Sequence, residues 1–369
     1  MEFTHDTLGQ RVALASGRAR EVVATEVARL RGTRVMVIAG QTEADLADKV
    51  TQGLDVALRW GEVRQHVPVE LARRARTAAA DAGVDLIVCV GGGSTTGLAK
   101  AVAMEVDAAI IAVPTTYAGS EATDVWGLTE DATKTTGVDP RVLPTTVVYD
   151  ADLTLSLPIG LTVASGLNGL AHCVDSLWAP RADPINLALA LEGARALAEG
   201  LPAVVADPDG RAGRERCLYG AYLSAVAFAS AGSGMHHKIC HVLGGAYDLP
   251  HAPTHAVVLP YVLAFNAPAV PELAGRLALA LGADAAAVEA DPAGAAVDAL
   301  EALRARLDAP RNLADVGLAE SDLPDAAERV LPSIPESNPA PVTPAALEAL
   351  LRAAWAGQTP RPIREGAHS

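Results

Sequence analysis

The chain has 369 residues, of which 50% are hydrophobic and 20% charged, so it has ample material for large cores and is not an intrinsically disordered protein. At roughly 100–200 residues per domain, this length predicts two domains. The formal net charge of −15 argues against a nucleic-acid or anionic-membrane partner, because either would favour a basic face. It leaves room for an anionic small-molecule substrate in a locally basic pocket.

Cysteine usage and the N-terminal sequence both indicate a reducing compartment. None of the four cysteines forms a CxxC pair, which is typical of buried free thiols. The first residues lack the basic and apolar regions of a secretory signal peptide. The sequence also contains no apolar run of the roughly 18 residues that a membrane span needs. We therefore expect a cytoplasmic protein.

The first 155 residues alternate between short apolar runs and alanine-rich helical stretches. The predicted strands are 34–39, 56–60, 85–90 and 109–113. The predicted helices are 43–54, 69–82 and a segment that follows a glycine-rich turn and ends at about residue 104. Continuous apolar strands that alternate with helices indicate a parallel sheet covered on both faces. The sequence therefore predicts an α/β domain over residues 1–155.

From residue 156 onwards the pattern has helical periodicity and little strand signal. The predicted helices are 158–178, 184–205, 211–231, 235–244, 253–266, 271–282, 292–306, 321–330 and 344–356. Several prolines between residues 332 and 344 indicate a loop before the last helix. We therefore expect an all-α second domain over residues 156–369.

A glycine-rich turn, Gly91–Ser94, directly follows the third predicted strand. Three glycines let a backbone approach a phosphate closely, and the free N–H groups at the start of the next helix favour an anion. Ser94 can cap that helix or donate to the phosphate. By itself the turn is equally compatible with a plain structural role. Its position at the carboxyl end of a buried strand favours phosphate binding.

A second polar segment, Pro114–Thr123, follows the fourth predicted strand. It carries several hydroxyl groups, on Thr115, Thr116, Tyr117, Ser120 and Thr123. The segment reaches the same edge of the sheet as the glycine-rich turn, because both follow parallel strands. A polar loop with capping hydroxyls is the alternative interpretation.

Histidines are concentrated in the second domain. Five of the nine lie between residues 236 and 255, and a sixth, His172, follows Asn168 by four residues. On a predicted helix this spacing places Asn168 and His172 on one face, and His237 and His241 share a face in the same way. The clustering favours a functional site over isolated structural histidines. We expect His255, however, to be a cap or a surface residue.

The residue at position 168 decides what kind of site the histidines form. An aspartate there, together with His172, His237 and His251, would be typical of a divalent metal centre with one carboxylate and three imidazoles. Asn168 is a neutral amide instead. The sequence therefore leaves two possibilities, a metal centre without a carboxylate or a histidine-lined pocket for an anion.

Taken in order, these motifs resemble the iron-containing alcohol dehydrogenase superfamily, which includes glycerol dehydrogenases and, more distantly, dehydroquinate synthases. Within it the chain is most similar to the maleylacetate reductase branch. The resemblance covers roughly residues 10–355 and rests on the sequences GGGSTTGLAK, PTTYAGSEAT, SGLNGLAH and HHKICHVLGGAYDLPH. Metal-dependent alcohol dehydrogenases of this superfamily carry aspartate where this chain has Gly97 and Asn168.

The resemblance implies a dehydroquinate synthase-like fold. Residues 1–155 would form a Rossmann-like dinucleotide-binding domain with a parallel sheet, and residues 156–369 a helical domain, with the active site in the cleft between them. It also implies a homodimer, in which an edge strand near residues 11–16 would pair across a two-fold axis.

The resemblance also assigns site residues. It implies that the cofactor is bound by Gly92, Gly93, Ser94, Thr115, Thr116 and Ser120. It maps the family's metal ligands onto a degenerate site of Asn168, His172, His237 and His251, for which we expect no metal. The choice between NADH and NADPH stays open, because the turn after the first predicted strand of the sheet reads Ala-Gly-Gln and offers no carboxylate to repel a 2′-phosphate.

The activity implied is the NAD(P)H-dependent reduction of the C=C bond of maleylacetate to 3-oxoadipate, in the degradation of aromatic compounds. We expect histidine donors to replace the metal as stabilisers of charge on the ketone oxygen. His241 or His237 would donate the proton, and His172 and His251 would complete the catalytic set. The dicarboxylate substrate would be bound by Asn168, Lys238 and Tyr117, with Tyr117 as a pocket wall or hydroxyl donor.

Three other interpretations remain open. The protein could be a related NAD(P)H reductase of another unsaturated or keto acid in a biosynthetic pathway. It could be a metal-dependent alcohol dehydrogenase that holds zinc or iron on His172, His237 and His251. It could also be a catalytically silent cofactor-binding or scaffold protein, although the retained histidines argue against this.

Overall fold

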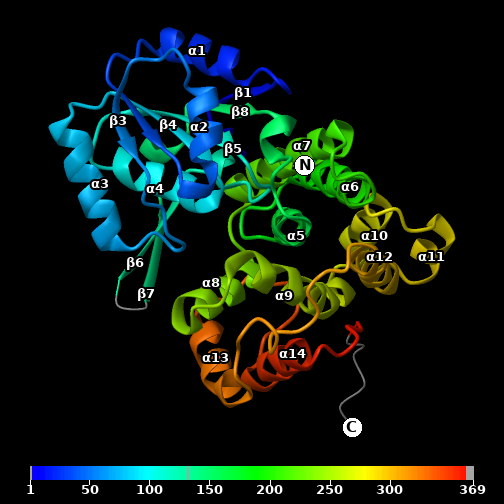
Figure 1. Ribbon diagram of the computed structural model, residues 1–369. Coiled ribbons are helices and arrows are strands. Elements are labelled where there is room, and N and C mark those ends of the chain that lie inside the picture. The colour runs from blue at the N-terminus through cyan, green and yellow to red at the C-terminus, as the bar shows by residue number, and fades with distance from the viewer. Residues whose placement is uncertain (1, 131–132, 363–369) are drawn as a thin grey trace. The chain divides into compact units, whose positions relative to one another are not determined.

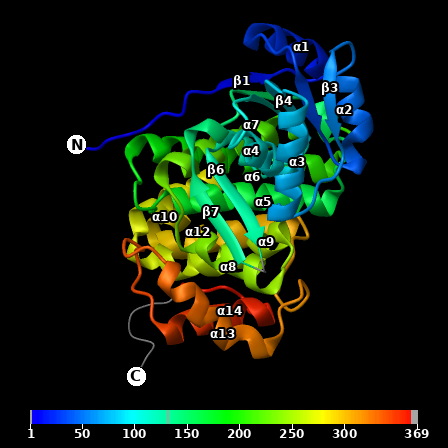
Figure 2. The same ribbon diagram turned by 90° about the vertical axis from the view of Figure 1, so that its left-hand side faces the viewer.

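The computed structural model describes residues 2–130 and 133–362 and divides into two compact units (Figures 1 and 2). The sheet unit comprises Thr7–Leu157 together with Asp209–Leu218. The helical unit comprises Met1–Asp6, Pro158–Pro208 and Tyr219–Ser369. The sheet unit is therefore built from two separate stretches of chain.

The sheet unit contains a six-stranded sheet in which every pairing is parallel. Its strands, in spatial order, are β1 (Arg11–Leu14), β8 (Thr146–Tyr149), β5 (Ala109–Pro114), β4 (Leu86–Gly91), β2 (Val35–Ile38) and β3 (Val56–Trp60). The parallel sheet predicted from the apolar runs is confirmed, and β2 to β5 lie where the sequence indicated. Strand β8 was not predicted, because its short apolar run lies among turns.

Helices cover both faces of this sheet, and alternate residues of each strand enter different cores. Met36 and Ile38 of β2 pack with α3 (Val69–Asp81) and α4 (Gly93–Ala103). Val35 and Val37 pack on the other face with α1 (Ala19–Leu30) and α2 (Ala44–Val50). Helix α1 was not predicted from the sequence.

An antiparallel hairpin, also not predicted, consists of β6 (Val125–Glu130) and β7 (Thr133–Val138) (Figure 2). Thr129 of β6 anchors it to the segment before α3. Its N–H donates to the Val67 carbonyl at 3.1 Å, and its hydroxyl donates to the His66 carbonyl at 2.8 Å. His66 and Val67 have φ angles of 61° and 45°. This left-handed conformation is strained for a β-branched residue such as Val67.

The helical unit confirms the all-α prediction. Its helices are α5 (Ile159–Ser176), α6 (Pro184–Ala206), α8 (Met235–Tyr247), α9 (His251–Asn266), α10 (Pro271–Ala280), α11 (Ala285–Ala290), α12 (Pro292–Arg306), α13 (Leu323–Val330) and α14 (Pro344–Ala356). Helix α7 (Arg211–Ala231) begins in the sheet unit and ends in the helical unit. Only the short α11 was missed from the sequence.

Two packing contacts of this unit position the site. Helix α5 packs against α6, α8 and α9 (Figure 1). Helices α8 and α9 share an apolar core with α13 and α14, in which Met235 and Ile239 of α8 meet Val258 and Val262 of α9. In the described part of the chain, no helix combines the length and the hydropathy that crossing a membrane requires.

Candidate active site

Helix α5 brings three polar side chains into the helical unit, those of Asn168, His172 and Asp175. Spacings of four and three residues place them on one face of the helix. Every residue from Thr162 to Ser176 is buried, so these polar groups are removed from water. A buried polar group costs free energy unless a partner satisfies it, and the neighbouring helices supply partners for some of these atoms only.

The ring of His237, from the first turn of α8, is the centre of an aromatic cluster. It stacks on His172 with the centroids 4.7 Å apart and an interplanar angle of 13°, and it tilts against Phe228 at 4.3 Å. Its centroid lies 4.8 Å from that of His255 and 6.0 Å from that of His241. The structure therefore brings together histidines from α5, α8 and α9, as the sequence predicted.

A second layer of histidines lies behind His237. A nitrogen-to-nitrogen distance of 2.9 Å joins His236 Nε2 to His255 Nδ1, and both rings are completely buried. The expectation that His255 is a cap or surface residue was wrong. Helix α9 begins at His251 and not near residue 253, so His251 and His255 share a helix face and their centroids are 4.3 Å apart. The late predicted start of the helix concealed this spacing.

Asp175 was also missed from the sequence, yet it contacts His237 directly. Its Oδ2 lies 2.7 Å from Nδ1 of His237, and its carboxylate also accepts backbone N–H groups at the start of α8 from Gly234, His236 and His237. The only sequence signal was its place three residues after His172. This spacing indicates a site residue only when the structure shows that α8 begins beside α5.

Several ring and amide atoms that face the cluster are buried with no hydrogen-bond partner among the described residues. These atoms are Asn168 Oδ1, His172 Nδ1, His236 Nδ1, His237 Nε2 and His255 Nε2. Natural proteins rarely leave such groups unsatisfied, and exceptions call for a functional explanation. Five unsatisfied atoms on these residues indicate a place that could bind a polar ligand.

The buried imidazoles are neutral at physiological pH. Burial lowers the pKa of His172 to about 3, and burial together with the positive charge of a protonated His172 lowers that of His236 to about 3. The pKa values of His237 and His255 are lowered well below 6.5, first by burial and then by neighbouring histidines. Each neutral ring offers one N–H donor and one acceptor. The cluster therefore consists of directional hydrogen-bonding groups and not of cations.

The remaining predicted residues of this unit are partly exposed. His241 and His251 stack loosely, with centroids 6.4 Å apart and an interplanar angle of 16°. Lys238 follows His237 on α8 and is also partly exposed, and its charge acts to lower the pKa of Asp175. The cluster thus has a fully buried part, which contains His236 and His255, and a partly exposed part, which contains His241 and His251.

In the sheet unit, the start of α4 is shaped for an anion. A Cβ on Gly92 would lie 2.9 Å from Cγ2 of Thr116, so this glycine allows a close approach of two chain segments. A Cβ on Gly93 would make only ordinary van der Waals contacts, the nearest with Cβ of Ala118 at 3.7 Å. Gly93 and Ser94 form the first turn of α4, where N–H groups lack helical acceptors. These features fit the binding of a diphosphate.

A buried lysine on α4 holds the second predicted loop against this turn. Lys100 Nζ donates to the carbonyls of Ser120 at 2.7 Å and Val125 at 2.8 Å, and to the Thr123 hydroxyl at 3.0 Å. Burial lowers the pKa of Lys100 to about 7. The backbone N–H of Thr115 donates to the Gly91 carbonyl at 3.1 Å. The glycine turn and the hydroxyl-rich loop therefore lie together, as predicted.

Tyr117 is fully buried in the sheet unit. Its hydroxyl lies 3.3 Å from Oγ1 of Thr154 and accepts from Nη1 of Arg214 at 3.5 Å, and burial raises its pKa to about 12. Arg214 comes from the first turns of α7, is 1% exposed, and also donates to the Thr154 carbonyl. The hydroxyl is thus engaged inside the sheet unit, and the role of Tyr117 as pocket wall or hydroxyl donor stays a prediction.

Comparisons with known proteins agree over the whole chain. The family model of the iron-containing alcohol dehydrogenases matches residues 11–151, and that of the C-terminal part of the Fe-containing alcohol dehydrogenase family matches 162–355. The chain is 45% identical to maleylacetate reductase 2 of Cupriavidus pinatubonensis, over 97% of its own length and 98% of the relative's. The chain belongs to the iron-containing alcohol dehydrogenase family.

Solved structures of this family have the same fold. A crystal structure of an iron-containing alcohol dehydrogenase from Corynebacterium glutamicum is 55% identical, with a TM-score of 0.93 and 98% of both chains covered. A crystal structure of maleylacetate reductase from Agrobacterium tumefaciens is 40% identical, with a TM-score of 0.89 and coverage of 98% and 100%. The predicted fold is therefore confirmed. Family membership makes the protein an oxidoreductase and implies that it uses NAD(P)H.

The family is named for iron, and the donor set at this site differs from a divalent-cation site that includes a carboxylate. At the positions that the resemblance gives for the ligands, the chain offers one amide and three imidazoles. One nitrogen from each of His236, His237 and His255 lies within 4.8 Å of the others, so these rings could share an ion. The buried imidazoles among these donors are neutral, and the nearby carboxylate of Asp175 already accepts hydrogen bonds from N–H groups. A divalent cation would lack an anionic ligand here.

The second departure from the metal-dependent members also has a structural correlate. A Cβ on Gly97 would lie 3.0 Å from Cγ2 of Val67, the strained residue that Thr129 holds in place. A larger side chain at position 97 would therefore have to displace Val67. Gly97 therefore lies in close contact with the segment that precedes α3.

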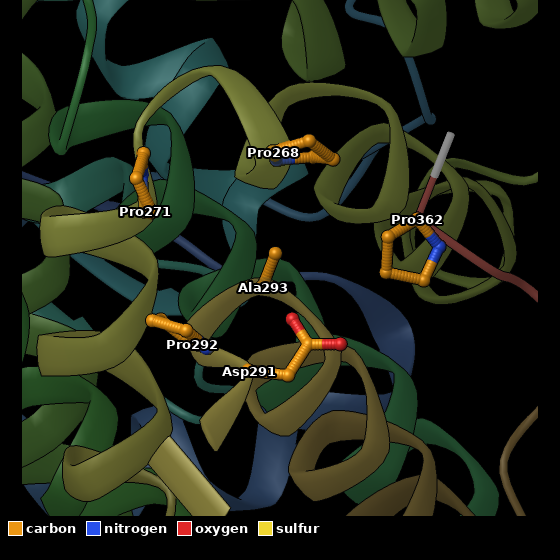
Figure 3. A pocket seen from close by; sticks show the side chains of 6 residues that line it. All are labelled: Pro268, Pro271, Asp291, Pro292, Ala293 and Pro362. Carbon is orange, nitrogen blue, oxygen red and sulfur yellow. The ribbon is translucent and has the colours of Figure 1, made fainter. Parts of the chain in front are cut away.

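A separate pocket in the helical unit contains none of the cluster residues (Figure 3). It is lined by Pro268, Pro271, Asp291, Pro292, Ala293 and Pro362. Its one carboxylate, on Asp291, accepts the backbone N–H of Gly294 at 3.0 Å and so caps α12. Its lining lacks the histidines that proton transfer would use.

Proposed function

We propose that this protein is a maleylacetate reductase that works without a metal. It reduces the C=C bond of maleylacetate, or of a closely similar keto-enedioate, to give 3-oxoadipate. The similarity of the chain to known enzymes supports this substrate, because it is 40–45% identical to several maleylacetate reductases over nearly its full length.

The single observation that carries the metal-free part of the proposal is Asn168 in its surroundings. Its Oδ1 is buried without a partner beside neutral imidazoles, at the position where metal-dependent relatives have an anionic ligand. A neutral amide weakens the hold on a cation. It also removes the repulsion that a carboxylate would exert on a dicarboxylate substrate.

The reaction needs a hydride, a proton and a group that stabilises negative charge. Bound NAD(P)H supplies the hydride, which adds to the alkene carbon β to the ketone. Charge then develops on the ketone oxygen as an enolate, and the carbon α to the ketone takes the proton. A neutral imidazole can donate a hydrogen bond to such an oxygen. We assign this donation to the rings of His172 and His251.

The proton comes from His241 or His237. His241 is partly exposed and can recover a proton from solvent, whereas His237 is 2% exposed and depends on its neighbours. The substrate carboxylates are bound by the amide of Asn168 and the ammonium of Lys238 through charge-assisted hydrogen bonds. A bound carboxylate also favours the protonated form of a neighbouring histidine, which suits a proton donor.

The cofactor is held by the sheet unit. Its diphosphate would be bound by the first turn of α4, at Gly92, Gly93 and Ser94. The hydroxyl groups of Thr115, Thr116 and Ser120 would bind the remaining polar groups of the cofactor. Lys100 contributes indirectly, because it fixes the carbonyl of Ser120.

The deciding experiment follows the oxidation of NADH and of NADPH by absorbance, with maleylacetate as the substrate. It is run on protein treated with a chelator and on the same protein loaded with Zn²⁺ or Fe²⁺. We expect equal turnover with and without chelator. Loss of activity on chelation, restored by metal, would show instead a metal-dependent enzyme on His172, His237 and His251. If the cofactor is oxidised with another unsaturated acid but not with maleylacetate, that other acid is the substrate.

We also propose a homodimer formed through β1. This strand lies at the edge of the sheet, and Val12 and Leu14 on it are 37% and 45% exposed. Exposed apolar side chains on an open strand edge favour pairing with a second copy. Sedimentation of the wild type and of a Val12→Lys variant tests this, since the variant should shift towards monomer.

A further inference from the structure

We propose that Asp175 is a positioning residue for the reduction, because it fixes His237 in the tautomer that carries its proton on Nδ1 and so presents Nε2 to the cluster. The catalytic part of this inference rests on the proposed function. The tautomer itself is a property of the protein that can be measured without any substrate.

Asp175 is completely buried and makes four close contacts, all to nitrogen atoms at the start of α8. Its Oδ2 lies 2.7 Å from Nδ1 of His237, 3.1 Å from the backbone nitrogen of His237 and 3.1 Å from that of Gly234. Its Oδ1 lies 3.3 Å from the backbone nitrogen of His236. An ionised carboxylate can only accept hydrogen bonds, so Nδ1 of His237 must be the donor.

The surroundings favour the ionised carboxylate in this arrangement. Three backbone N–H groups donate to the carboxylate, and such hydrogen bonds favour its ionised form. The partial positive charge at the N-terminus of α8 acts in the same direction. Only the ionised form accepts from all four nitrogens at once, and a protonated form would lose part of the helix cap.

The orientation of the His237 ring follows from two separate constraints. Stacking on His172 and contact with Phe228 fix the plane of the ring. Stacking cannot distinguish the two orientations related by a half-turn about the bond to the ring. The hydrogen bond to Asp175 does distinguish them, since it requires Nδ1 on the side of the α8 N-terminus. Nε2 then faces the cluster, where it is buried without a partner among the described residues.

The chemical consequence concerns which atom moves a proton. With the Nδ1 proton held by Asp175, any proton that His237 takes up or releases in the site does so at Nε2. After release the ring is already in the tautomer that Asp175 stabilises, so no reorientation is needed. Without Asp175 a neutral ring would favour no one orientation, and Nε2 would carry a proton or point away in part of the molecules. This function is distinct from capping α8, although one carboxylate serves both.

The first experiment is ¹⁵N NMR of the full-length protein with labelled histidine rings, assigned with the variant His237→Gln. We expect a neutral His237 ring with a protonated Nδ1 whose hydrogen exchanges slowly with solvent. An unprotonated Nδ1 with a protonated Nε2 in the wild type would overturn the proposal. This outcome is independent of the substrate, so it remains decisive even if maleylacetate proves to be the wrong acid.

The second experiment is a double-mutant cycle with Asp175→Ala and His237→Gln, read out by kcat, KM and thermal unfolding. We expect Asp175→Ala alone to lower kcat by about 10²-fold or more, within the range of proton-transfer catalysis, and to leave KM nearly unchanged. In the His237→Gln background it should lower Tm again but not kcat, because the effect on kcat passes through His237. Multiplicative losses of kcat would mean that Asp175 only supports the helix.

Discussion

The substitution Asn168→Asp tests the reasoning about the metal site most directly. It places a carboxylate where the side chain is 2% exposed and its neighbours are neutral imidazoles. Without a cation the new group avoids ionisation by an upward shift of its pKa. A shift of about 3 pKa units corresponds to about 4 kcal/mol at neutral pH. For a unit of this size we therefore expect Tm to fall by roughly 8–16 °C.

A divalent cation should reverse part of this loss. Zinc at about 100 times its dissociation constant stabilises the folded state by about 2.7 kcal/mol, which corresponds to roughly 5–11 °C in Tm. The assay is thermal unfolding of the wild type, Asn168→Asp and Asn168→Ala, each with zinc and with chelator. Asn168→Ala is the matched control, since it removes the amide without adding charge. An equal zinc-induced shift in all three proteins would refute the role assigned to position 168.

Three further predictions concern other parts of the molecule. Gly93→Ala should weaken NAD(P)H binding about tenfold or more with little change in Tm, because the added Cβ has room in the protein itself. Gly61→Ala is the control, since a Cβ there would lie in open space. Equal affinities of the two variants for the cofactor, measured by fluorescence titration, would contradict the phosphate site. His241→Ala should lower kcat by about 10²–10⁴-fold and alter its pH profile; full turnover with an unchanged profile would exclude it as the donor. Burial and His172 lower the pKa of His236 from 6.5 to about 3. Between these pH values the unfolded chain binds more protons than the folded protein, so the free energy of unfolding should fall as the pH drops from 6.5 to about 3. Urea titration at several pH values measures this fall.

Local patterns in the sequence were sufficient for most of the sheet. Strands β2, β4 and β5 are buried on both faces and therefore read as continuous apolar runs, which single them out without any tertiary information. Strand β8 is equally buried, but its short run lies among turns and is recognisable only through its pairing with β1 and β5. The strands of the hairpin β6–β7 are rich in glycine and threonine and show no continuous apolar run. Thr129 connects the hairpin to the segment before α3, a contact that the sequence does not reveal.

The site shows the same division between local and tertiary information. Spacings of four residues revealed His172 beside Asn168 and His241 beside His237, since both pairs lie within one helix. Asp175 acts across two helices, from α5 to the start of α8, and no spacing along the chain encodes that contact. The role of Asp175 becomes visible only in the structure, where its carboxylate accepts the N–H groups at the start of α8.

The assignment of Asp209–Leu218 to the sheet unit has a consequence for how this protein can be divided. A gene fragment that ends at residue 157 would encode all six strands of the sheet, yet it would lack the first turns of α7. Arg214 would then be missing from its buried place against the Tyr117 hydroxyl and Thr154. The sheet unit therefore does not coincide with one continuous N-terminal segment. A version that folds alone would need the segment 209–218 supplied in trans or spliced on by circular permutation.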